Sequence, residues 1–132
     1  MKKVWYAPNR FESYGEEEIK AVEECLRDGW LAGFGPRSVD FEEKVAKYFG
    51  KKYGVFVNSG SSACLLALAS LDLPKGCKVI TPACTFSTTL APIIQLGFKP
   101  IFCDVNLTSY IPDIEDIIAL IDDDVKAIMV PN

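Results

Sequence analysis

The sequence of 132 residues contains no histidine. This absence removes the commonest general base and the commonest metal ligand, so we expect no metal site. The two familiar nucleotide-binding motifs are also missing, because no Gly-x-x-x-x-Gly-Lys-Ser/Thr occurs and no Gly-x-Gly-x-x-Gly follows an apolar run. If the chain binds a phosphate group, it must hold that group in another way.

Long hydrophobic runs are absent too. No stretch of about 18 apolar residues occurs, and the first residues lack the apolar segment of a signal peptide. The cysteines number five, an odd count without any Cys-x-x-Cys, which predicts buried free thiols in a reducing compartment. We therefore expect a cytoplasmic protein with no membrane partner.

The basic residues form no stripe, and the formal net charge is −4. This distribution excludes the electrostatic footprint that nucleic acid or an anionic membrane surface requires. A sugar or another metabolite is the more natural partner. The hydrophobic content of 49% over 132 residues is enough for a packed domain.

The most informative stretch runs from Tyr53 to Ser70. An apolar run from Gly54 to Val57 predicts a strand, five small polar residues from Asn58 to Ser62 predict a turn, and the alanine- and leucine-rich remainder predicts a helix. A helix start carries unpaired N–H groups and a positive dipole end, which together attract anions. We interpret this turn as a phosphate site, although an ordinary turn with a serine N-cap fits the same residues.

Other segments predict alternating strands and helices. The acidic run after Ser13 is typical of a helix start with a capping box, Ser38 is predicted to cap a second helix, Pro92 falls inside a later one, and Pro112 suits the first position of the last. The predicted helices end near Gly29, Gly50, Gly97 and Ile121, and the predicted later strands cover Lys78 to Thr81, Pro100 to Val105 and Lys126 to Val130.

This order predicts the α/β class, with a mostly parallel sheet and helices on both faces. The turns at 58–62 and 82–87 each follow a strand, so both could face one crevice at the carboxyl ends of the strands. The last predicted strand lacks a helix to cover it. We therefore expect an irregular segment over 1–12, and over 13–132 the incomplete amino-terminal part of a larger α/β domain.

Four segments together resemble a known family. They are the run from Trp30 to Arg37 with Phe41-Glu42 behind it, Asn58 to Ala63, Thr81-Pro82 with Thr85 to Thr89, and Pro100 to Val105. In this order and spacing the sequence resembles the amino-terminal part of the DegT-type sugar aminotransferases, which are fold type I enzymes dependent on pyridoxal 5'-phosphate. The resemblance extends from about Tyr14 to Asn132.

The resemblance implies a cofactor site. Gly60 and Ser61 match the pair that holds the cofactor phosphate, with Ser62 alongside, and Phe86 matches the aromatic residue that stacks on the pyridine ring. A plain core phenylalanine is the alternative for Phe86. Asp104 matches an aspartate for which a structural role, such as capping the loop before Tyr110, is the simpler interpretation.

The resemblance also implies an activity and partners. Family members usually move an amino group from glutamate to a nucleotide-linked keto-sugar, and the loop from Gly33 to Pro36 implies a homodimer contact. The catalytic lysine and aspartate match positions beyond Asn132, so the catalytic residues are unknown. A sugar dehydratase of the same fold, in which a histidine replaces the lysine, and a non-catalytic phosphate-binding fragment both remain open.

Overall fold

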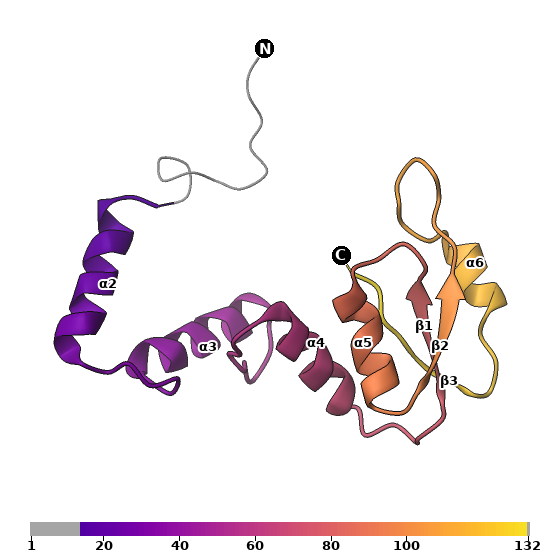
Figure 1. Cartoon of the computed structure of the whole chain (residues 1–132), viewed down its shortest axis with the longest axis horizontal. Coiled ribbons are helices and arrows are strands. Elements are labelled where there is room, and N and C mark those ends of the chain that lie inside the picture. The colour runs from indigo at the N-terminus through magenta and orange to yellow at the C-terminus, as the bar shows by residue number, and fades with distance from the viewer. Residues whose placement is uncertain (1–13, 132) are drawn as a thin grey trace, which may run out of the picture. The chain divides into compact units, whose positions relative to one another are not determined.

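The computed structural model describes residues 14–131 (Figure 1). The chain forms two compact units, Met1–Phe56 and Val57–Asn132, and each is described by itself. The irregular segment expected over 1–12 and Ser13 of the expected capping box lie outside the described residues.

The first unit contains two helices, α2 (Glu16–Asp28) and α3 (Pro36–Tyr48). The backbone N–H of Gly15 donates to Glu18 Oε2 at 2.7 Å, and this bond holds the pKa of the Glu18 carboxyl below its ordinary value. Three glutamates fill the first turn of α2, where negative charge suits the helix dipole. Gly29 follows the helix with a φ of 70°, which confirms the predicted end.

Helix α3 begins earlier than predicted. Gly35 is its N-cap and Pro36 its first residue, whereas Ser38 already donates its backbone N–H to the Gly35 carbonyl at 3.0 Å. The prediction that Ser38 caps this helix is therefore wrong. Proline has a helical φ and lacks the N–H that would be unpaired at the first position of a helix, so it is favoured there. The helix therefore begins at Pro36, ahead of Ser38.

The second unit contains α4 (Gly60–Ala69), β1 (Lys78–Pro82), α5 (Ser87–Gln95), β2 (Lys99–Cys103), α6 (Ile114–Ala119) and β3 (Val125–Ile128). The three strands form a parallel sheet in the order β2-β1-β3, with Lys78 aligned to Lys99 and to Val125. Figure 1 shows α5 and α6 on opposite sides of this sheet. The predicted α/β class with a parallel sheet is confirmed.

The core of this unit lies between the sheet and the pair α4 and α5. Its buried members are Leu68, Cys77, Val79, Ile93 and Phe98. Because β1 is the central strand, Val79 and Ile80 are both fully buried.

Pro92 lies in the interior of α5, so the late helix start that would have made it an early position does not occur. Its side chain is fully buried, and Leu96 still donates its N–H to the Pro92 carbonyl at 3.0 Å. Packing of the ring offsets the missing hydrogen bond, a gain that the local sequence does not reveal.

Two further predictions are wrong. Pro112 precedes the N-cap Asp113 of α6 and is not its first residue. The run from Gly54 to Val57 is not a strand, because no described strand pairs with it. Instead, the N–H of Phe56 donates to the side chain of Glu42 on α3 at 2.7 Å. An extended apolar segment becomes a strand only when a neighbouring strand accepts its hydrogen bonds.

Candidate functional site

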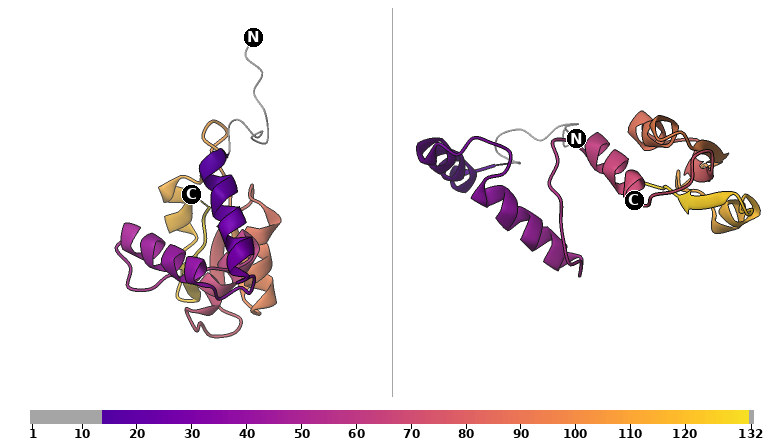
Figure 2. Two further views of the ribbon diagram at one scale, coloured as in Figure 1. Left: turned by 90° about the vertical axis from the view of Figure 1, so that its left-hand side faces the viewer. Right: turned by 90° about the horizontal axis from the view of Figure 1, so that it is seen from below.

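Two helix starts lie at the carboxyl end of the parallel sheet. The chain leaves β1 at Pro82 and enters α5 at Ser87, so the start of α5 lies at this end. Helix α4 packs against α5 (Figures 1 and 2). Like α5, it is followed by a strand that begins at the amino end of the sheet, so its own start lies toward the carboxyl end. The predicted turns at 58–62 and 82–87 therefore both lie toward the carboxyl ends of the strands, where ligands of α/β proteins bind.

The turn before α4 is organised by its own side chains. The N-cap Ser59 accepts the N–H of Ser62 on Oγ at 3.2 Å, and Ser62 Oγ donates to Asn58 Oδ1 at 2.7 Å. The amides of Gly60 and Ser61 have no acceptor within residues 14–131. The first turn of α4 thus offers two free N–H donors and the Ser61 hydroxyl to an anion.

Gly60 lies beside open space. A Cβ built on Gly60 would meet no atom within 4 Å, and its φ is not in the left-handed region. Neither the backbone nor a neighbouring side chain requires glycine here. The space that a side chain would fill is the space through which an anion would reach the amides, so these residues fit the phosphate of pyridoxal phosphate.

Phe86 is the N-cap residue of α5, with 76% of its surface exposed. It belongs to no core cluster among the described residues, and the interpretation as a plain core phenylalanine is wrong for this structure. An exposed aromatic ring at the carboxyl edge of a sheet is free to stack on a planar ligand. Its place beside a bound ring remains a prediction.

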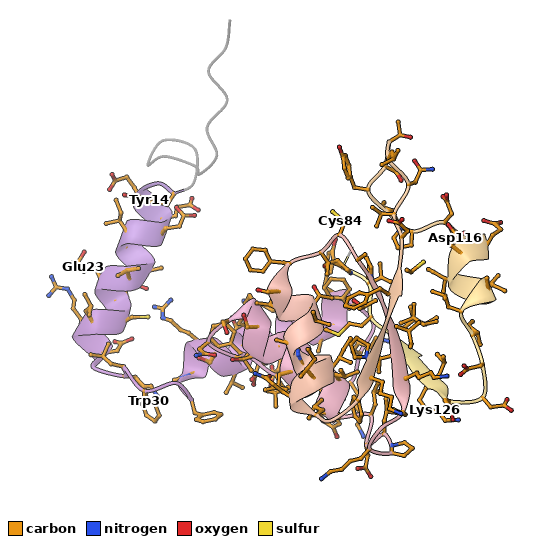
Figure 3. The ribbon with its side chains drawn as sticks, turned by 45° about the vertical axis from the view of Figure 1, so that its right-hand side comes forward. Tyr14, Glu23, Trp30, Cys84, Asp116 and Lys126 are labelled. Carbon is orange, nitrogen blue, oxygen red and sulfur yellow. The ribbon has the colours of Figure 1, made fainter. Side chains whose placement is uncertain are left out.

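The turn after β1 contains Cys84, one of the five cysteines that the sequence predicted to be buried. Cys84 is exposed on this turn, as Figure 3 shows, while Cys103 at the end of β2 is buried. The Ala83 N–H donates to the Cys103 carbonyl at 2.8 Å and extends the ladder past β1. Burial raises the pKa of the Cys103 thiol, so it is a poor nucleophile.

A row of threonines leads into α5. Thr85 Oγ1 donates to Thr89 Oγ1 at 3.0 Å, and both residues are at least partly buried. Thr81 on β1 is fully buried, and its hydroxyl has no hydrogen-bond partner among the described residues. Only a structure could reveal this, since threonine in a strand is ordinary.

Asp104 makes a local side-chain hydrogen bond at the start of the loop after β2, and its capping of the loop before Tyr110 stays a prediction. Its Oδ1 accepts the N–H of Val105 at 2.9 Å, directly after β2. The neighbouring Asn106 accepts both the N–H and the hydroxyl of Thr108 on its side-chain oxygen, and Tyr110 adopts a φ of 58°. These side chains thus satisfy backbone N–H groups of the loop that follows β2.

The loop between α2 and α3 carries Trp30, which is labelled in Figure 3. The indole Nε1 of Trp30 donates to the Phe34 carbonyl at 3.1 Å. A Cβ on Gly35 would lie 2.6 Å from Trp30 Cδ1, so only glycine allows the indole to pack here. Leu31 and Phe34 are left 71% and 87% exposed.

No helix in the described part of the chain is long and apolar enough to cross a membrane. Among the same residues, no group of three or more histidine, cysteine, aspartate or glutamate side chains could hold a metal ion. All five cysteines are within this part and are free thiols, but only Cys77 and Cys103 are buried, so the prediction that all five are buried is wrong.

Comparison with known proteins gives consistent matches. The model of the DegT/DnrJ/EryC1/StrS aminotransferase family matches residues 12–132. The chain is 39% identical over 106 residues to the Bacillus subtilis spore coat polysaccharide biosynthesis protein SpsC, covering 80% of this chain and 27% of that protein. It is 35% identical to a UDP-4-amino-4-deoxy-L-arabinose–oxoglutarate aminotransferase of Shewanella sediminis, covering 86% and 29%.

A solved structure is similarly close. The Escherichia coli GDP-4-keto-6-deoxy-D-mannose-3-dehydratase with bound hydrated pyridoxal phosphate superimposes with a TM-score of 0.83 at 35% identity, covering 89% of this chain and 31% of that one. The chain thus spans less than a third of the length of each of these three proteins.

Proposed function

Since the chain belongs to the DegT/DnrJ/EryC1/StrS aminotransferase family, we propose that the protein containing it is an aminotransferase dependent on pyridoxal 5'-phosphate. It moves an amino group from glutamate to a nucleotide-linked keto-sugar in the cytoplasm. The similarity to an aminotransferase named for a UDP-linked amino sugar and oxoglutarate supports this substrate class. The observation that carries the cofactor assignment is the pair of free amides beside open space at Gly60.

In this proposal the N–H groups of Gly60 and Ser61 and the Ser61 hydroxyl donate to the cofactor phosphate. These groups hold the charge of the phosphate at the positive end of α4. Ser62 lies alongside, and its hydroxyl keeps the turn in place by donating to Asn58 Oδ1. Phe86 packs its exposed ring against the pyridine ring and excludes water from that side. When bound, pyridoxal phosphate supplies an electron sink for the substrate carbon, while the protein supplies orientation and electrostatics.

The lysine that transfers the proton is expected beyond Asn132. Two of the lysines within the described residues, Lys78 and Lys44, are paired with carboxylates, which supports this expectation for them. Lys78 Nζ donates to Asp122 and lies 3.5 Å from Asp124, and Lys44 pairs with Asp40 on α3. These ion pairs occupy the ammonium groups that a Schiff-base lysine would need free.

A second candidate is a sugar dehydratase of the same fold. The observation that favours it is the similarity to the solved dehydratase, whose 35% identity equals that of the Shewanella aminotransferase. A non-catalytic phosphate-binding fragment is the third possibility. The three differ in how the cofactor is attached to the protein.

The test uses the longest form of the protein. Pyridoxal phosphate is added, the near-visible absorbance band is recorded, and borohydride is then applied. A band that borohydride bleaches, with the cofactor trapped on a lysine, supports the aminotransferase. Cofactor binding without a trapped lysine supports the dehydratase instead, and no binding at all overturns both enzyme assignments.

A further inference from the structure

Glu42 on α3 contacts the extended segment Gly54–Phe56 in two ways. Its carboxylate Oε1 accepts the backbone N–H of Phe56 at 2.7 Å. Its backbone carbonyl lies so close to Gly54 that a Cβ there would be 2.6 Å from the Glu42 oxygen. One residue of α3 therefore contacts the segment with both its side chain and its main chain.

A third contact comes from the neighbouring aromatic residue. The rings of Phe41 and Phe56 lie 5.3 Å apart between centroids, at an interplanar angle of 76°. This edge-to-face arrangement is the favoured geometry for an aromatic pair. Both rings are more than half exposed, so apolar burial alone does not hold the segment in place.

No strand in the described residues pairs with the segment, so strand pairing does not hold it in place either. Its one side-chain hydrogen bond to α3 goes to a carboxylate, and such charge-assisted bonds are short and strong. The requirement at Gly54 is steric: any larger residue would push the segment away from Glu42. The segment is therefore fixed to α3 at its first and last residues.

The contact with Glu42 lies directly before the candidate phosphate site in the chain. Phe56 is succeeded by Val57 and then by the turn at 58–62, whose amides are the proposed phosphate donors. If the segment before the turn were loosely held, the turn would adopt conformations that do not fit the phosphate. The apparent affinity for a ligand falls in proportion to the fraction of molecules that are competent to bind.

We propose that Glu42 is a positioning residue for the cofactor phosphate. It acts through the Phe56 amide and does not touch the cofactor. This inference rests on the proposed function, because it assumes that the turn at 58–62 binds pyridoxal phosphate. No motif predicted the role, since a half-exposed glutamate on an amphipathic helix is otherwise typical of a solvated surface.

The experiment compares E42A, E42Q and the wild type in the longest form of the protein. The first readout is hydrogen exchange at the Phe56 amide, measured without cofactor. Loss of a hydrogen bond to a charged group is expected to speed this exchange about tenfold or more in E42A. E42Q keeps an oxygen acceptor and is expected to restore most of the protection.

The second readout is the pyridoxal phosphate concentration that half-saturates the absorbance band. We expect a rise of about tenfold in E42A, corresponding to a drop in the competent fraction to about a tenth, and near wild-type binding in E42Q. Two controls are matched to E42A. E43A removes an exposed carboxylate from the same helix, and A46G destabilises α3 while leaving the Glu42 contact intact.

The outcomes separate this inference from the proposed function. If E42A binds the cofactor like the wild type, or if A46G weakens binding as much as E42A does, the positioning role is overturned. If the wild type itself binds no pyridoxal phosphate, the proposed function fails, whatever the exchange at Phe56 shows. Weakened binding in E42A with rescue in E42Q and unchanged controls supports the inference.

Discussion

Thr81 shows how much a single hydroxyl can cost in the centre of a sheet. It is fully buried on β1, and its Oγ1 has no partner within the described chain, whereas the nearby Thr89 accepts a hydrogen bond from Thr85. An unpaired buried hydroxyl loses its hydration and gains nothing in return. Thr81 and Thr89 are similarly buried, but the hydroxyl of Thr81 lowers the free energy of unfolding and the hydroxyl of Thr89 raises it.

Replacing Thr81 by valine should stabilise the protein. We expect the free energy of unfolding to rise by about 1–2 kcal/mol in T81V, because the desolvation cost of the hydroxyl disappears. The control T89V removes a satisfied hydroxyl and should lower stability by about 1 kcal/mol. Urea unfolding of both variants checks this. Equal losses in the two variants would show that Thr81 has a partner.

Gly60 makes a second prediction at this scale. G60D places a carboxylate in the open space beside the free amides of α4, where it would repel the phosphate and occupy the amides itself. We expect pyridoxal phosphate retention to be abolished while the fold stays intact. S38D adds the same charge to the first turn of α3 and should retain the cofactor. Retention by G60D, measured by absorbance after gel filtration, would remove the phosphate assignment.

At the scale of the elements, local signals located most helices and strands. The sequence predicted the features that depend on neighbouring residues alone. These are the glycines that end α2 and α3, the apolar runs of β1 and β2, and the small polar turn before α4. The failures concern long-range contacts. The run Gly54–Val57 is apolar and extended like a strand, but strand formation depends on a partner that local sequence does not name.

The ion pair between β1 and the turn before β3 gives a pH prediction. Hydrogen bonding to Lys78 holds the pKa of the Asp122 carboxyl below its ordinary value, and the same bond raises the pKa of the Lys78 ammonium. A depressed acid pKa stabilises the fold above the unfolded value of about 3.9, and this contribution is lost as the pH falls through the folded pKa. A raised lysine pKa stabilises the fold below about 10.4 and is lost as the pH rises through the folded value.

The test is the thermal midpoint of K78M against the wild type from acid to alkaline pH. We expect a constant difference between about pH 5 and pH 9, which shrinks on both sides of that window as one partner loses its charge. K126M is the control, since Lys126 Nζ donates to the Asp123 carbonyl, which does not titrate. A difference for K78M that persists unchanged below about pH 3 would contradict the role of Asp122.

At the scale of the whole molecule, the sequence predicted the family and the sheet but not the chemistry. The turn at 58–62 could be proposed as a phosphate site from sequence because the amides of a helix start attract anions without particular side chains, and its binding of phosphate stays a prediction. The catalytic lysine could not be placed, since no lysine here matches its position. The choice between aminotransferase and dehydratase depends on that residue, and the similarities of 35% to one example of each do not separate them.

The loop between α2 and α3 supports a prediction about assembly. The Trp30 indole donates to the Phe34 carbonyl within this loop, and the Phe34 side chain is 87% exposed. Aromatic residues are typical anchors of interfaces. We propose that the protein is a homodimer and that F34D lowers the dimer fraction, measured by sedimentation velocity. L107D, an equally exposed change in the other unit, is the control. A stable F34D dimer would place the interface elsewhere.

Among residues 14–131, the strand order β2-β1-β3 leaves the outer sides of β2 and β3 without a partner strand, and these are the two rims of the sheet. Each rim presents unpaired backbone groups, which can template pairing with any extended peptide nearby. Lys99 and Pro100 lie on the first rim and Lys126 on the second. The lysine charges and the missing N–H of proline discourage aggregation through strand pairing at these rims. A strand with a complementary pattern of charges and hydrogen-bonding groups can still pair there.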